Sequence, residues 1–227
     1  MIALRKFCYD RGILKTTRFT VPVIVVGNIS VGGTGKSPLT AAIALYLKQQ
    51  GLHPGLVSRG YGGTATQWPQ SVTSNSDPSL VGDEPVMLVQ QTGCPMVVGP
   101  DRIAAVKSLL HQHDCDVIIS DDGLQHYALA RDIEIAVMDG ARRCGNGLCL
   151  PAGPLREPVS RLSTVDFVVC QGDALPSETA MQLQISHVTL VKDPSRIIPL
   201  ADLKNTPVHA IAGIGHPERF FTALEQQ

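Results

Sequence analysis

The sequence has no excess of either charge. Its 19 Lys and Arg residues balance 20 Asp and Glu residues, which gives a formal net charge of -1. A nearly neutral chain has no long-range field that draws nucleic acid or an anionic membrane to the whole molecule, so any basic surface must be local. We therefore expect no nucleic-acid partner. The sequence also lacks internal repeats and low-complexity tracts, and no obligate protein partner is evident from it.

The six cysteines lack the CxxC spacing that metal sites and redox motifs use. They are scattered through apolar segments, which favours reduced thiols in a cytosolic protein over a disulfide framework. Cys144 and Cys149 are the closest pair. Because they have no His or Cys partners at zinc spacing, we interpret them as ordinary loop thiols.

An apolar run long enough to span a bilayer is missing from the N-terminal segment, residues 1–19. This segment has the pattern of neither a transmembrane helix nor a signal peptide. It carries five cations and one anion, and a basic segment of this kind can lie against acidic headgroups. A solvated lead-in to the first strand explains the same residues, so both interpretations remain open.

Short, β-branched apolar runs alternate with helical stretches along the chain. The candidate strands are residues 21–27, 54–58, 95–99, 116–120, 133–139, 165–170 and 208–213. Residues 38–51 and 101–113 carry apolar side chains at helical spacing, with Gly51 suited to a C′ position and Asp101 to an N-cap. This order predicts an α/β fold like that of P-loop NTPases, with a doubly wound, mostly parallel sheet and helices on both faces.

Two irregular regions interrupt this pattern. Residues 59–82 are rich in Gly, Ser, Thr and Pro, and they predict a long loop after the second strand, where loops are usually functional. Residues 140–164 contain several Gly and Pro residues and predict a link to a smaller, incomplete C-terminal α/β part. We therefore expect a nucleotide-binding domain at 20–155 and a smaller domain at 156–227, preceded by the basic lead-in at 1–19.

The strongest motif is SVGGTGKS, which follows a predicted strand and precedes a predicted helix, as a P-loop must. Its glycines permit backbone conformations that turn successive N–H groups toward phosphate oxygens. We expect Lys36 to reach the β- and γ-phosphates and the Ser37 hydroxyl to ligate Mg²⁺. The alternative, a glycine-rich turn without a ligand, does not require Gly-Lys-Ser at a helix start. The predicted nucleotide-binding residues are Ser30, Val31, Gly32, Gly33, Thr34, Gly35, Lys36 and Ser37.

A second apolar strand ends in two acids, in the sequence DVIISDDGLQH. A carboxylate at the C-terminal end of a strand beside the P-loop is what a Walker B element supplies to hold Mg²⁺. Asp121 and Asp122 are both candidates. Adjacent side chains of an extended chain point to opposite sides, so we expect different roles for the two. His126 is a candidate for a phosphate or base role, although a lone histidine is more often structural.

Other polar candidates lie in loops. Asp101 is the candidate group to orient or deprotonate an attacking hydroxyl, in addition to capping a helix. Arg59 in SRGYGG is placed to contact a substrate phosphate. Arg156 and Glu157 in PAGPLREP are a second cation and carboxylate, whose default interpretation is a surface ion pair.

The motifs VVGNISVGGTGKSP, SRGYGG, VGDEP, DDGLQH and PAGPLREP, in this order, resemble those of the tetraacyldisaccharide 4′-kinases, the lipid A 4′-kinases of Gram-negative bacteria. The resemblance runs from about residue 20 to the C-terminus. It implies ATP- and Mg²⁺-dependent phosphorylation of the 4′-hydroxyl of a tetraacylated glucosamine disaccharide, an acylated lipid substrate, at the cytoplasmic face of the inner membrane. Family members carry Ser or Thr where the general P-loop pattern begins with Gly, so Ser30 fits the family.

The resemblance also implies roles for single residues. The catalytic candidates are Lys36, Asp101, Asp122 and His126. The metal-binding candidates are Ser37, Asp121, Asp122 and Glu157. The candidates for contact with the substrate are Arg59, Tyr61 and Arg156.

The family pattern extends beyond both ends of this sequence. It begins with an apolar, membrane-associating helix, and it continues past GIGHPERFF with an FPDH-type and a TEKDA-type segment. We therefore expect a chain truncated at both ends, with an intact ATP loop and reduced or absent kinase activity.

Two other functions remain open. A P-loop ATPase or switch that acts on a partner protein begins with a similar strand and loop, and it would hydrolyse nucleotide without an acceptor sugar. An inactive nucleotide-binding fragment of the kinase would bind ATP without turnover. A GTPase is disfavoured, because the sequence has no NKxD-type motif.

Overall fold

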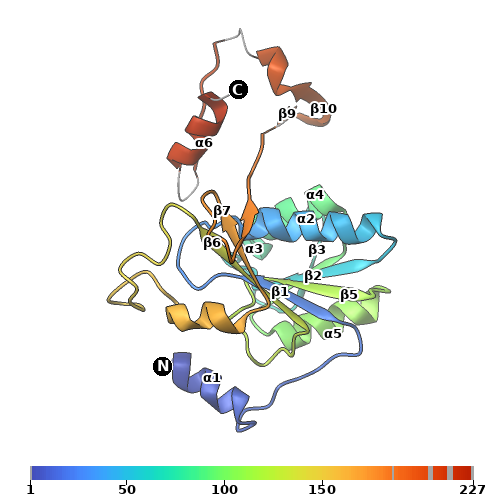
Figure 1. The fold of residues 1–227 in the computed structure, drawn as a ribbon. Helices are drawn as coiled ribbons and strands as arrows, with labels where there is room; N and C mark the ends of the chain where they lie inside the picture. The colour runs from blue at the N-terminus through green and yellow to red at the C-terminus, as the bar shows by residue number, and fades with distance from the viewer. Residues whose placement is uncertain (1, 186, 204–206, 214–216, 226–227) are drawn as a thin grey trace. The chain divides into compact units, whose positions relative to one another are not determined.

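The computed structural model describes residues 2–185, 187–203, 207–213 and 217–225. The chain divides into two compact units, Met1–Met181 and Gln182–Gln227. The larger unit holds an eight-stranded sheet and the helices that cover it (Figure 1).

The sheet has the strand order β3-β4-β2-β5-β1-β6-β7-β8. Its strands are β1 (Val23–Gly27), β2 (Pro54–Ser58), β3 (Gln70–Val72), β4 (Met96–Val98), β5 (Val117–Asp121), β6 (Ile133–Asp139), β7 (Phe167–Gln171) and β8 (Thr179–Met181). Neighbouring strands run parallel, except that β3 pairs antiparallel with β4. The predicted α/β fold with a mostly parallel sheet is confirmed. β1 lies between β5 and β6, so the segment that follows β1 emerges near the middle of the sheet.

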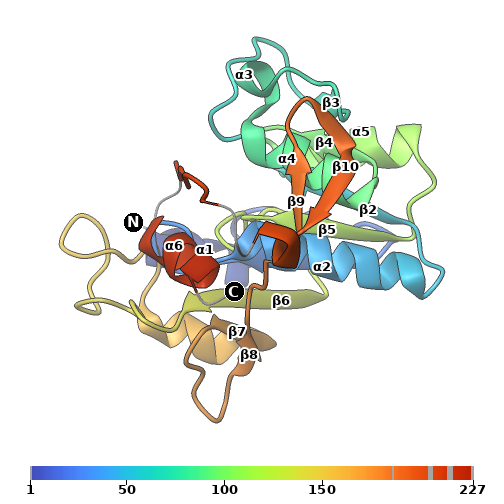
Figure 2. The same ribbon diagram turned by 90° about the horizontal axis from the view of Figure 1, so that it is seen from above.

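Helices cover both faces of this sheet (Figures 1 and 2). α2 (Lys36–Gln49) and α4 (Asp83–Thr92) pack on one face, where Ala44 and Leu88 join Ile119 in one buried cluster. α5 (Arg102–Gln112) packs on the other face, where Leu109 joins Ile118 in a second cluster. Consecutive residues of β5 thus contribute to opposite cores, which explains why it begins with three apolar residues in a row, Val117–Ile119. This unit also contains two short helices, α3 (Pro78–Val81) and the 3-10 helix η1 (Val159–Thr164).

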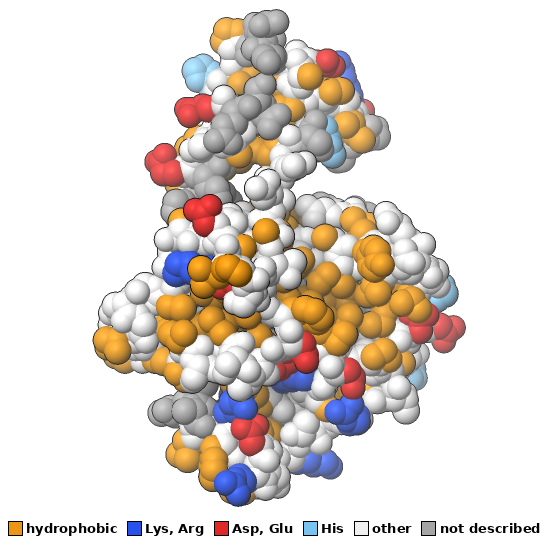
Figure 3. All heavy atoms as spheres, in the orientation of Figure 1, with side chains coloured by type: hydrophobic (Ala, Val, Ile, Leu, Met, Phe, Trp, Pro, Cys, Tyr) orange, Lys and Arg blue, Asp and Glu red, His pale blue; other side chains and the backbone are white. Residues whose placement is uncertain are grey.

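The N-terminal segment begins with α1 (Ile2–Asp10), a helix that we did not predict. Lys6 Nζ pairs with Asp10 at 2.7 Å, and the ring of Tyr9 lies 6.0 Å from that of Tyr127. Hydrophobic and basic side chains lie side by side at the lower end of Figure 3, where α1 lies in Figure 1. Exposed large hydrophobic residues of this segment are Leu4, Phe7, Ile13 and Leu14. In the described parts of the chain, no helix combines the length and apolarity needed to cross a membrane.

The smaller unit has its own secondary structure. Its elements are β9 (His187–Leu190), β10 (Asp193–Pro199), the 3-10 helix η2 (Leu200–Leu203) and α6 (Pro217–Glu225). β9 and β10 form an antiparallel pair, with Val188 opposite Ile198. The strand predicted at residues 208–213 is wrong, because these residues have no regular secondary structure. Residues 214–216 of the GIGHPERFF segment lie outside the described residues.

The division between the units follows Met181, whereas we predicted a boundary at residue 155. Residues 167–171 form β7, which pairs with β6, and β8 pairs in turn with β7. The apolar run that we assigned to the C-terminal part therefore extends the main sheet.

Candidate phosphate-binding site

The glycine-rich segment connects the end of β1 at Gly27 to the start of α2 at Lys36. Gly35 caps α2 with a positive φ of 88° and makes no side-chain cap hydrogen bond. The first N–H groups of α2 therefore have no capping side chain, which leaves them available to an anion. Gly32 also has a positive φ, of 97°. These two positions need glycine, because other residues rarely adopt this backbone conformation.

The PAGPLREP segment, residues 151–158, runs beside this loop. The Val31 N–H donates to the Pro154 carbonyl at 2.9 Å, and the Arg156 N–H donates to the Ile29 carbonyl at 2.6 Å. These backbone hydrogen bonds join two motifs that lie far apart in the sequence. They hold Arg156 at the phosphate-binding loop.

Asp122 is the centre of a charged cluster beside the loop. Arg156 Nη1 donates to both of its carboxylate oxygens, at 2.8 and 2.9 Å. Lys36 Nζ lies 3.8 Å from Asp122 Oδ1. The structure therefore brings together three predicted site residues, and Arg156 pairs with Asp122 rather than with Glu157. Asp122 has a positive φ of 48°, which is uncommon outside glycine and asparagine and tends to occur at functional sites.

Asp121 points to a different partner. The Thr40 hydroxyl on α2 donates to Asp121 Oδ1 at 2.9 Å, and the residue is buried. Burial raises the pKa of the Asp121 carboxyl to about 6, and the hydrogen bond from Thr40 opposes this effect. A buried carboxylate with a raised pKa is short of compensating positive charge, which a cation would supply.

These donors fit a magnesium site. Mg²⁺ prefers hard oxygen ligands, usually one or two carboxylates together with phosphate oxygens and water. The Ser37 hydroxyl at the start of α2 and the carboxylates of Asp121 and Asp122 are donors of this type. Within the described ranges, no group of three or more His, Cys, Asp or Glu residues could hold a metal ion, so nucleotide phosphates and water would have to complete the coordination.

Glu157, a predicted metal ligand, takes part in a buried network instead. Gln125 Nε2 donates to its Oε1 at 2.7 Å, and the Tyr127 hydroxyl donates to its Oε2. Arg161 Nε lies 3.4 Å from the same Oε2. Because both carboxylate oxygens have protein partners, we leave Glu157 out of the proposed magnesium site.

Glu84, near the start of α4, is a candidate that we did not identify from the sequence. Desolvation raises the pKa of its carboxyl, with Lys36 opposing this shift and the charge of Asp122 adding to it. Its carboxyl therefore lies within electrostatic reach of the charged cluster. Glu84 belongs to the VGDEP motif. Its acids follow a loop rather than a predicted strand, whereas we looked for metal-binding acids at the ends of predicted strands.

Asp101 caps α5, as predicted. Its Oδ1 accepts hydrogen bonds from the N–H groups of Ile103 and Ala104, at 2.8 and 3.3 Å. The next residue, Arg102, is buried, and its Nη1 donates to the Gly99 carbonyl at 2.9 Å. Burial lowers the pKa of Arg102 to about 10, so the guanidinium stays protonated at neutral pH. The catalytic role of Asp101 stays a prediction.

Arg59 and Tyr61 lie in the loop that follows β2, and both are exposed. The charge of Arg59 helps to lower the pKa of Arg102, after the larger effect of burial, so Arg59 is near the carboxyl ends of the strands. A Cβ on Gly82 would lie 2.6 Å from the Tyr61 carbonyl oxygen. The Arg59 loop therefore packs against the start of α4, next to Glu84.

His126 is half-buried, and its buried Nε2 has no hydrogen-bond partner among the described residues. Burial lowers its pKa to about 4; the charge of Arg102 adds to this effect, and that of Asp101 opposes it. The side chain is therefore neutral at pH 7 in the folded protein.

The stability of the protein should depend on pH through His126. In the unfolded chain the imidazole takes up a proton near its ordinary pKa of about 6.5. Its contribution to stability is thus complete above pH 6.5 and is lost as the pH falls toward 4. We expect His126→Gln to remove this pH dependence, as measured by urea unfolding between pH 4 and 7. Parallel curves for the two proteins would contradict the assignment.

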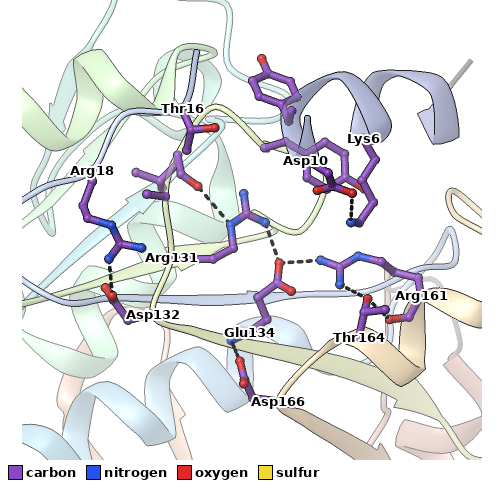
Figure 4. Close-up of a pocket in the computed structure, with 14 residues that line it drawn as sticks. Lys6, Asp10, Thr16, Arg18, Arg131, Asp132, Glu134, Arg161, Thr164 and Asp166 are labelled. Carbon is purple, nitrogen blue, oxygen red and sulfur yellow. Dashed lines mark hydrogen bonds and ion pairs between the residues drawn. The ribbon is translucent and has the colours of Figure 1, made fainter. Parts of the chain in front are cut away.

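A separate cavity of about 440 Å³ lies between α1 and the start of β6 (Figure 4). Arg131 and Arg161 both bind Glu134 Oε1, at 2.8 and 2.5 Å. Arg18 binds Asp132 Oδ1 at 2.6 Å. These cations already have carboxylate partners. The ion pairs that line the cavity join separate segments of the chain to one another, so we assign the cavity no ligand.

The sequence model of the family described as "LpxK: Tetraacyldisaccharide-1-P 4'-kinase" matches residues 1–227. The chain is 54% identical to the tetraacyldisaccharide 4′-kinase of Nitrosococcus oceani, over 98% of this chain and 66% of the relative. It is 52% identical to that of Coxiella burnetii, over 99% of this chain and 66% of the relative. The chain thus spans just under two thirds of the length of these curated relatives.

A solved structure is similar over nearly the whole chain. It is a crystal structure of LpxK from Aquifex aeolicus in complex with ATP, 29% identical in sequence, with a TM-score of 0.82. The similarity covers 99% of this chain and 73% of the solved chain. Since the family model matches the entire sequence, the chain belongs to the tetraacyldisaccharide-1-P 4′-kinase family.

Proposed function

We propose that this chain is an ATP-dependent phosphotransferase that phosphorylates the 4′-hydroxyl of a tetraacylated glucosamine disaccharide 1-phosphate, giving lipid IVA. The observation that carries the proposal is the cluster of Lys36, Asp122 and Arg156 beside the uncapped start of α2. Family membership supports the choice of acceptor, and the similarity to an ATP-bound structure supports ATP as the donor.

In this proposal the loop amides and Lys36 hold the β- and γ-phosphates of ATP, and Arg156 adds a second cation on the side of Asp122. Ser37, Asp121 and Asp122 would hold Mg²⁺, which would neutralise phosphate charge during transfer. The protein supplies position and fixed charge rather than covalent chemistry.

The acceptor hydroxyl requires a carboxylate to orient it or to take its proton. Asp101 is the candidate from the sequence. Glu84 is supported by its place at the start of α4 and by the effect of the Lys36 charge on its pKa, which desolvation raises. Glu84 and the preceding Asp83 are both exposed, and Asp83 accepts a hydrogen bond from the Glu84 N–H at 3.0 Å. We propose that this acidic pair faces the acceptor, with Arg59 and Tyr61 beside it.

ADP release with and without the glycolipid acceptor tests the proposed function. A kinase releases ADP only when the acceptor is present and forms a phosphorylated lipid. ADP release independent of the acceptor would favour an ATPase or switch. Tight ATP binding without any turnover would favour a nucleotide-binding role alone.

The magnesium site makes a separate prediction. Asp122→Asn removes negative charge next to Lys36 and Arg156, so we expect metal-free ATP to bind about tenfold more tightly. Mg²⁺ should then improve ATP binding less than in the unmodified protein, because a ligand is lost. Equilibrium dialysis with Mg²⁺ or with EDTA measures both effects. Asp116→Asn, which alters an exposed acid at the start of the same strand segment, is the control. Equal metal dependence in all three proteins would remove Asp122 from the site.

We further propose that α1 and the residues after it lie on the cytoplasmic surface of the inner membrane, as a peripheral contact. The exposed Leu4, Phe7 and Ile13 alternate with cations in this segment, which is the composition of an interfacial helix. Sedimentation with vesicles that contain anionic phospholipid should carry the protein down, and neutral vesicles should do so less. Equal recovery with both would contradict an electrostatic contribution.

A further inference from the structure

A further cation, Arg142, lies directly on the phosphate-binding loop. Arg142 Nη2 donates to the Gly33 carbonyl at 2.7 Å. A Cβ built on Gly32 would lie only 2.8 Å from Arg142 Nη1. The positive φ of Gly32 requires glycine, and the short distance shows that the guanidinium rests against the loop at this residue.

A buried carboxylate fixes the direction of this side chain. Asp139 ends β6, the strand next to β1, and it is buried. Its Oδ2 accepts from Arg142 Nε at 3.0 Å, and its Oδ1 accepts from the Arg142 N–H at 3.1 Å. Backbone and side chain of Arg142 are both held, so little conformational entropy is left to lose when a ligand arrives.

One end of the guanidinium stays open. Within the described part of the chain, Arg142 Nη1 donates no hydrogen bond, and the side chain is 38% exposed. A brace for the Gly33 carbonyl would need only a neutral donor. The Arg142 guanidinium carries a permanent charge and lies over a loop whose N–H groups and Lys36 suit phosphate. This arrangement fits the binding of an anion better than the support of a carbonyl group.

We propose that Arg142 is a phosphate-binding residue of the nucleotide site, in which Nη1 donates to an oxygen of the β- or γ-phosphate while Asp139 holds the guanidinium across Gly32 and Gly33. This assignment rests on the proposed binding of ATP. It adds Arg142, which follows β6, to the two cations already proposed for the site, Lys36 at the start of α2 and Arg156. Charge that develops on the phosphoryl group during transfer would then be stabilised by all three.

The test compares the affinities of ATP, ADP and AMP by equilibrium binding, so it does not depend on kinase turnover. We expect Arg142→Ala to weaken ATP, or ATP and ADP together, about tenfold, and AMP less than twofold. Arg142→Lys keeps the charge without the planar fork, so its loss should be smaller. The matched control is Arg143→Ala, because Arg143 pairs with Glu178 at 2.7 Å; all its affinities should stay within about twofold.

The outcomes are distinct. A loss confined to ATP assigns Arg142 to the γ-phosphate, and a loss shared by ATP and ADP assigns it to the β-phosphate. An equal loss for all three nucleotides would mean that Arg142 only braces the loop and would overturn the proposal, as would unchanged binding. If the unmodified chain bound ATP normally while Arg142→Ala had no effect, the proposed kinase site would stand without this residue. Failure of the unmodified chain to bind ATP would overturn both.

Discussion

Replacing Lys36 with alanine is expected to weaken ATP binding by about a hundredfold or more. The side chain is largely buried, 11% exposed, and its ammonium lies 3.8 Å from Asp122 at the mouth of the loop. A cation in this partly dry position interacts with phosphate more strongly than one in open solvent does. The variant also leaves Asp122 with less positive charge near it, which adds repulsion of the nucleotide. Equilibrium binding of ATP measures the effect.

Lys48→Ala is the matched control, because Lys48 lies in the last turn of the same helix. Its Nζ donates to the Thr92 carbonyl at 2.7 Å, so its loss affects a local tie between α2 and the end of α4. We expect ATP affinity to stay within about twofold in this variant. If Lys36→Ala bound ATP as well as Lys48→Ala does, the loop would not be the nucleotide site.

The sheet and the phosphate-binding loop could be predicted from the sequence because their signals are local. β1, β2 and β5 are buried at every residue, so each is mainly a run of consecutive apolar residues. The loop needs glycine where φ is positive, at Gly32 and Gly35, and these glycines stand next to the Lys-Ser pair in sequence. The glycines that the backbone requires and the Lys-Ser pair that we expect to bind phosphate thus occur within the same eight residues.

The partners of the loop could not be predicted, because they arrive from distant elements. Arg142 reaches Gly33 only because β6 pairs with β1. Glu84 comes within reach of Lys36 through the packing of α4 beside α2 on one face of the sheet. The spacing of Arg142 and Glu84 along the chain does not indicate that either residue lies close to the phosphate-binding loop.

The errors also have physical causes. Residues 208–213 are as apolar as a strand, but a strand needs a paired neighbour, and hydropathy does not identify one. Residues 167–171 have such a neighbour in β6, so they extend the main sheet beyond the boundary that we predicted at 155. Glu157 stands next to Arg156 in sequence, yet the two side chains bind different partners, Tyr127 and Asp122.

The acidic residue that engages the acceptor can be identified by comparing Glu84→Gln with Asp101→Asn. Both variants remove one charge and keep the size of the side chain. We expect Glu84→Gln to reduce acceptor phosphorylation about a hundredfold, because general bases contribute on this scale. ATP affinity should change little or rise slightly, since the lost charge lies near Lys36 and the phosphates.

Asp101→Asn should behave differently if its main role is structural. Asparagine is also a good N-cap, so the hydrogen bonds to Ile103 and Ala104 can persist and stability should change by less than about 1 kcal/mol. Transfer to the acceptor, measured with saturating ATP and Mg²⁺, then separates the two residues. A large loss of transfer in Asp101→Asn, with normal transfer in Glu84→Gln, would restore the aspartate predicted from the sequence and exclude Glu84. A large loss in both would mean that the acceptor hydroxyl is held between the starts of α4 and α5, the two helices that begin on opposite faces of the sheet at its carboxyl edge.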